Sequence, residues 1–241
     1  MSENRDLPIH ASFLASVASP RVQDLLTDAA DVTLDAITDS EVLKHIPFVK
    51  VVVAIRSVRE RVRLRTTYRF FAKLNDMSQE EREAFVKRLE ADPQQARKIG
   101  ESFAVWLDRL DDEEKAELLA KVFELYARGK IDFDRSARFA VVIDRAHVPY
   151  LLHLGRDRFG SSVWDRYDDI KAHLLALGLL RITAHQRDVD RQLSLGRPSR
   201  DVELVKMELN EDGRIFQDYV VGETPVKSRI TERVGTPPKA R

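Results

Sequence analysis

The residues with the clearest chemical potential are basic and lie close together in the sequence. Between positions 50 and 73 the chain has eight Lys or Arg residues and a single acid, Glu60. The whole chain has 40 basic and 40 acidic residues, so this run is a local excess in a neutral protein. Concentrated positive charge attracts nucleic acid or anionic phospholipid head groups. The predicted anionic-partner surface consists of Lys50, Arg56, Arg59, Arg61, Arg63, Arg65, Arg69 and Lys73.

The same positive excess also has an explanation inside the fold. A start signal at Ser19-Pro20 predicts a first helix. One face of that helix is acidic, through Asp24, Asp28, Asp31 and Asp35. If this face meets the basic residues, their charge is absorbed internally; otherwise they form a solvated face or bind an external anion. The sequence leaves these alternatives open.

Two runs of carboxylates form a second group of chemical interest. Clustered carboxylates bind Mg²⁺ or act as general acid and base. Each run also coincides with a predicted helix start, where the helix dipole favours negative charge, so we favour a capping role. The residues are Asp108, Asp111, Asp112, Glu113 and Glu114 in the first run and Asp132 and Asp134 in the second.

Other signatures of catalysis or cofactor binding are missing from the sequence. The chain has no cysteine, which excludes thiolate catalysis, disulfides and cysteine-ligated metals. Glycine-rich phosphate-binding motifs and the nucleophile motif G-x-S-x-G are absent. We predict no catalytic, cofactor-binding or metal-binding residue, and no enzyme. No zinc-site spacing occurs among the histidines, which are His10, His45, His147, His153, His173 and His185.

Helix signals dominate the first three quarters of the chain. Ser78 to Glu81 match a capping box, and Asp92-Pro93 and Asp111-Asp112 are further start signals. The short connections between these helices are typical of a compact bundle. The basic run falls in a predicted amphipathic helix over 48–74, although the valines at 51–53 also suit a short buried strand. The predicted core includes Phe103, Trp106, Leu119 and Phe123.

The pattern changes after Gly155. A helix that ends at Gly178 is followed by a predicted strand over 179–183, a polar loop, a second strand over 202–209 and a short helix capped by Asn210. This order is typical of the end of a winged-helix domain. We therefore predict a mainly α fold, with a multi-helix bundle followed by a small winged-helix-like α+β unit. The predicted parts are an N-terminal extension (1–18), the bundle (19–155), the winged-helix-like unit (156–221) and a disordered tail (222–241).

Three stretches resemble a family of uncharacterised bacterial helical proteins with a winged-helix-like C-terminal part. They are AELLAKVFELYARGKIDF at 116–133, LLALGLL at 174–180 and ELNEDGR at 208–214. The resemblance covers roughly residues 43–220 and implies the same helical-plus-winged layout. It implies no catalytic residues. Its motifs are helix caps and apolar stripes, so their specificity for function is low. The polar insertion at 184–201 departs from the short wing that the family layout implies.

The predicted function is that of a non-enzymatic interaction or regulatory protein of the cytoplasm. The predicted recognition helix, 161–177, has a net charge of −1, which phosphates would oppose, so a protein partner, including a second copy, is favoured over DNA. Nucleic acid is the other candidate partner, and it would bind to the basic helix. The alternative is a peripheral membrane protein that docks through residues 48–74, and the third reading is a cryptic enzyme. We expect a cytoplasmic location because residues 1–17 do not resemble an export signal and no long apolar span exists.

Overall fold

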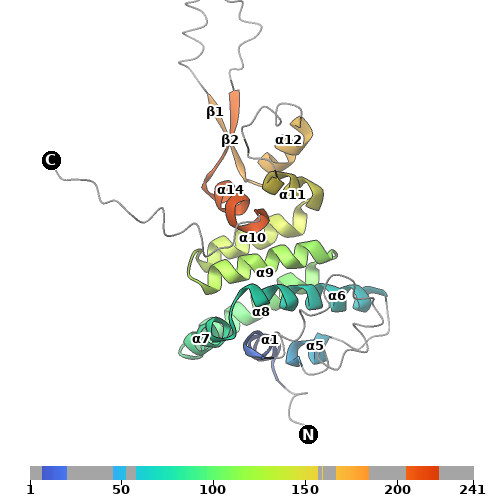
Figure 1. Cartoon of the computed structure of the whole chain (residues 1–241), viewed down its shortest axis with the longest axis vertical. Helices are drawn as coiled ribbons and strands as arrows, with labels where there is room; N and C mark the ends of the chain where they lie inside the picture. Colours follow the sequence, from blue (N-terminus) through green and yellow to red (C-terminus); the bar gives the residue numbers. More distant parts are fainter. Residues whose placement is uncertain are drawn as a thin grey trace, which may run out of the picture. The chain divides into compact units, whose positions relative to one another are not determined.

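The computed structural model describes residues 7–20, 46–52, 58–156, 159, 167–184 and 205–222 (Figure 1). These residues are mostly helical, with one small sheet, so the predicted mainly α fold is confirmed. The chain divides into two compact units, Met1–Asp144 and Arg145–Arg241. In the described ranges, no helix is both long and apolar enough to cross a membrane.

The first unit is built from helices. The segment at 48–52 is helical rather than extended. The elements are α1 (Ile9–Ala18), α5 (Pro47–Val52), α6 (Val58–Lys73), the 3₁₀ turn η1 (Leu74–Asp76), α7 (Gln79–Glu90), α8 (Pro93–Arg109), α9 (Glu113–Ala127) and α10 (Phe133–Arg145).

Side-chain caps set where these helices begin. At α7, Ser78 N donates to Glu81 Oε2 at 2.8 Å and Glu81 N donates to Ser78 Oγ at 3.2 Å, which is the predicted capping box. The Asp112 side chain accepts from the first turn of α9, as predicted. At α10 the capping carboxylate is Asp132, which accepts from Arg135 N at 2.7 Å. Local sequence therefore decides these boundaries.

Aromatic rings from most helices meet in the core of the first unit. Phe13 of α1 is fully buried, and its ring lies within about 6 Å of five other phenylalanine rings. Gly100 allows α8 to pack closely against α1, because a Cβ at this position would lie only 2.8 Å from the His10 backbone oxygen. Burial of Phe103, Leu119 and Phe123 is confirmed, whereas Trp106 stays partly exposed and stacks on Phe133.

The second unit combines short helices with a two-stranded antiparallel sheet. Its elements are α11 (Val148–Arg156), α12 (Asp168–Ala176), β1 (Leu180–Ala184), β2 (Val205–Leu209), α14 (Glu211–Ile215) and the π-helical turn η4 (Phe216–Val221). Gly178 ends α12 with φ +74°, and Asn210 caps α14 by accepting from Gly213 N at 2.8 Å, both as predicted. The β1–β2 register pairs Leu180 with Leu209 and Ile182 with Met207.

Several predictions fall outside the described residues. They concern the acidic helix that contains Asp24, the start of the helix at Ser161, the insertion after Ala184 and the tail after Gly222. The same holds for half of the predicted anionic-partner surface, the side chains of Lys50, Arg56, Arg59 and Arg61.

Candidate functional site

The described half of the predicted anionic-partner surface consists of Arg63, Arg65, Arg69 and Lys73 on α6. The first of these, Arg63, forms a two-point contact with Asp108 near the end of α8. Its Nε lies 2.8 Å from Asp108 Oδ1, and its Nη2 donates to Oδ2 at 2.9 Å. Only the Nη2 contact has hydrogen-bond geometry, and a charge-assisted hydrogen bond of this kind is stronger than one between neutral groups. Arg63 is thus tied to a carboxylate of its own unit.

Glu113, the first residue of α9, bridges the next two arginines. Its Oε1 lies 2.6 Å from Arg65 Nε, and its Oε2 accepts from Arg69 Nε at 2.8 Å. Arg69 also reaches Glu117 Oε1 at 3.6 Å. The hydrogen bond from Arg69 to Glu113 raises the pKa of the guanidinium, with further help from the negative charge of Glu117. One carboxylate therefore holds two successive cations of the basic helix.

The order of these pairs shows how α6 and α9 are arranged. Higher-numbered residues of α6 pair with higher-numbered residues of α9, so the two packed helices run in the same direction. On α6 the cations 65, 69 and 73 recur every fourth residue, and on α9 the charged residues 113, 117 and 121 do the same. Residues four apart share a helix face. Two charged ladders thus lie against each other.

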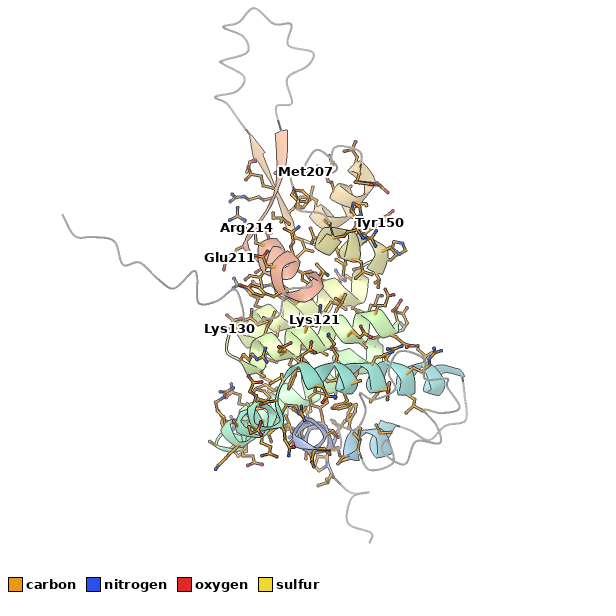
Figure 2. The ribbon with its side chains drawn as sticks, in the orientation of Figure 1. Lys121, Lys130, Tyr150, Met207, Glu211 and Arg214 are labelled. Atoms are coloured by element: carbon orange, nitrogen blue, oxygen red, sulfur yellow. The ribbon has the colours of Figure 1, made fainter. Side chains whose placement is uncertain are left out.

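The ladders end at a group of charges in which Asp76 is exposed, whereas Glu124 and Arg128 are largely buried. Lys73 Nζ lies 2.8 Å from Asp76 Oδ2. Burial lowers the pKa of the nearby Lys121, and the positive charge of Lys73 lowers it further (Figure 2). Burial also raises the pKa of Glu124, against the opposing effect of Arg128, with which it forms an ion pair. Both shifts disfavour charge, which is the expected effect of removing water.

We call this whole set the charged seam. Arg128 extends it to α7, because its Nη2 lies 3.1 Å from Glu81 Oε2. The seam has equal numbers of cations and carboxylates, all from the first unit. Its members are Arg63, Arg65, Arg69, Lys73, Lys121 and Arg128 with Asp76, Glu81, Asp108, Glu113, Glu117 and Glu124.

The seam joins two features that the sequence presented separately. The carboxylate run supplies Asp108 and Glu113 as partners of the basic helix, whereas Asp112 is a helix cap as predicted. From the sequence, the expected internal partner of the basic residues was the acidic first helix. The carboxylate run was expected to cap helices and not to pair with the basic residues. Sequence reasoning also missed Glu117, Lys121, Glu124 and Arg128, although their spacing of three or four along α9 marks a single charged face.

A buried arginine outside the seam was also missed. Arg82 of α7 is fully buried, and burial lowers its pKa. Its guanidinium donates to backbone carbonyls of Val17 at 3.0 Å, Met77 at 2.8 Å and Leu74 at 3.4 Å. Carbonyls at the end of a helix such as α1 lack helical partners, whereas the Leu74 carbonyl also accepts from Met77 N at 3.0 Å. Arg82 therefore acts as a shared cap that ties α1 to α7.

In the second unit, α11 and α12 bring together aromatic and titratable side chains. Tyr150 OH donates to Asp169 Oδ2 at 3.0 Å, and this bond raises the pKa of Tyr150. His147 N, at the start of α11, donates to His173 Nε2 at 3.2 Å. These bonds orient α11 against α12. Across the described ranges, no group of three or more His, Asp or Glu side chains is arranged to hold a metal ion.

The sheet of the second unit has one apolar and one polar face. Leu180 and Leu209 are buried at its inner end, but Ile182 on the same face is 56% exposed and the paired Met207 is half-buried (Figure 2). On the opposite face, Arg181 pairs with Glu208 at 3.3 Å. The apolar face thus continues from the core of the unit to its surface.

In comparisons with known proteins, no protein family, curated protein or solved structure matches this chain.

Proposed function

We propose that the chain is a non-enzymatic cytoplasmic interaction protein that binds protein partners through the sheet of its second unit. In this proposal the first unit is a helical scaffold. The resemblance to bacterial helical proteins and the winged-helix-like character of the second unit belong to the same proposal. The order α12, β1, β2 and α14, with a helix before it, supports the winged-helix-like reading.

The charged seam supports the role of the first unit as a scaffold. Each described cation of the predicted anionic-partner surface lies against a carboxylate of the same unit. A polyanion that binds these side chains must first displace those carboxylates, because a paired charge attracts an external one only weakly. The carboxylates Asp108 and Glu113 are engaged in the same pairs, which favours a structural role for them over general acid or base chemistry.

The apolar face of the sheet is the observation that carries the proposal. Ile182 is 56% exposed although it belongs to the same face as the buried Leu180 and Leu209. Apolar residues that continue a core outward, with polar residues around them, are typical of protein-binding surfaces.

A photo-reactive residue at position 182 tests this proposal in cells that produce the protein. The matched control is position 105 of α8, because Val105 is 52% exposed and also apolar. We expect illumination to give protein–protein adducts from position 182 and few from position 105, with the products identified by mass spectrometry. Equal yields from the two positions, or none from 182, would contradict the proposal.

The anion-binding alternative is tested separately with the purified chain. Flotation with anionic liposomes and a DNA mobility shift, both at low salt, compare the wild type with an Arg59→Glu, Arg63→Glu, Lys73→Glu variant. Because we place Arg63 and Lys73 in internal pairs, we expect no salt-dependent binding by the wild type. Binding that falls with salt and is lost in the variant would instead support a membrane or nucleic-acid surface on the basic helix.

A further inference from the structure

We infer that the partner of this sheet is a second copy of the chain, which pairs through β2. The two β2 strands would lie antiparallel about a two-fold axis at Met207 and form one four-stranded sheet in the order β1, β2, β2, β1. This inference rests on the proposed function, because it names the partner of the same sheet and places the contact along the β2 edge, next to the apolar face.

The edge of the sheet provides the means of pairing. Among the described residues the sheet has only two strands, so each strand has one edge that no other described strand covers. An open edge presents N–H and C=O groups that can accept another strand. A closed dimer needs a surface that complements itself under a two-fold rotation. The sequence of the edge strand decides whether that condition is met.

The charge pattern of β2 meets this condition. Its residues are Val205, Lys206, Met207, Glu208 and Leu209. A two-fold axis at Met207 sets Lys206 opposite Glu208 of the second copy, and the reverse pair repeats the match. Directly opposed residues of opposite charge stabilise antiparallel strands, whereas like charges destabilise them. In β1 a two-fold axis at Ile182 would set Arg181 opposite Thr183, which offers no such match.

The register of the sheet extends this match to both faces. Ile182 pairs with Met207, and Met207 would meet its own copy, so an unbroken apolar row would cross all four strands. In this register, Glu208 would have Arg181 of its own chain opposite it on one side and position 206 of the second copy, a lysine, opposite it on the other. The dimer would therefore bury more of the partly exposed Met207. It would also set no two residues of like charge directly opposite each other.

Cysteine substitution in the full chain tests the axis directly, because the natural chain has no cysteine. With Met207→Cys, the two thiols of a dimer face each other, and we expect oxidation to give a linked dimer. The control is Ile182→Cys, which is on the same face and more exposed, but one strand away from the axis. We expect the Met207→Cys chain to cross-link at least about tenfold faster, while equal rates would overturn the inference.

Charge reversal provides a second test by sedimentation. Lys206→Glu and Glu208→Lys should each weaken self-association by about tenfold or more, since each sets like charges opposite each other. A mixture of the two variants should restore association, because their strands complement each other. If the two variants stay apart when mixed, or if the wild type is monomeric at high concentration, the inference is overturned.

The two proposals can fail separately. A monomeric wild type whose position 182 still forms adducts with another protein in cells would retain the proposed function and overturn the dimer. A chain that forms neither adducts nor dimers would overturn both.

Discussion

At the residue scale, Glu113 is the key acid of the charged seam. It holds both Arg65 and Arg69 and also lies in the first turn of α9, as does Glu114, which is exposed. Glu113→Gln and Glu114→Gln should lose similar helix-dipole energy. We expect Glu113→Gln to lower the free energy of unfolding by about 0.5–1 kcal/mol more than Glu114→Gln at low salt. Denaturant titration at two salt concentrations measures this difference, and an excess that persists in high salt would contradict the ion-pair explanation.

Lys121 provides a test of burial in the same seam. Burial and the charge of Lys73 lower the pKa of Lys121 in the folded chain. Between this lowered pKa and the ordinary pKa of lysine, the unfolded chain therefore binds more protons than the folded chain. The stability of the wild type should therefore rise with pH through the window between the lowered pKa and the ordinary one. In Lys121→Met this contribution should vanish. The difference in unfolding free energy between the wild type and Lys121→Met, measured from pH 7 to 10, isolates the contribution of Lys121. A difference that does not change with pH would refute the lowered pKa of Lys121.

At the element scale, the aromatic core joins α1, α6, α7, α8 and α9. Phe123 of α9 is fully buried and lies within about 6 Å of the rings of Phe13, Phe70, Phe85 and Phe103. We expect Phe123→Ala to lower the free energy of unfolding by about 3–5 kcal/mol, because it removes buried surface and leaves a cavity. Val105→Ala, at an exposed site on α8, should change it little. Similar melting temperatures for the two variants would show that this packing is wrong.

At the scale of the whole molecule, the two compact units should respond separately to local damage. In the second unit, a Cβ at Gly213 would lie 2.1 Å from the Leu179 carbonyl oxygen. Gly213→Ala should therefore separate α14 from the base of the sheet and speed hydrogen exchange across the second unit. The adjacent exposed change Arg214→Ala is the control. Exchange in α8 and α9 should stay at its wild-type rate in both variants, and faster exchange there would show that the units unfold together.

The sequence alone determined the local structure of this protein. Helix starts at Ser78, Asp92 and Asp112 and the turn at Gly178 were predicted, because capping depends on residues within one helical turn. The buried faces that contain Phe103 and Phe123 were predicted from helical spacing. The sequence also identified four described cations of the seam, as well as Asp108 and Glu113, but only as separate features.

Only the tertiary structure decided which charges meet. Arg63 and Asp108 are 45 residues apart, and Arg69 and Glu113 are 44 residues apart. Their pairing depends on which helices pack side by side, and local periodicity does not specify that choice. Arg82 was missed for the same reason, since its carbonyl acceptors include Val17, 65 residues away. Local propensity acts within a few residues, whereas burial and ion pairing depend on how the whole chain packs. This is why the partners of Arg63, Arg65 and Arg69 could be identified only from the tertiary structure.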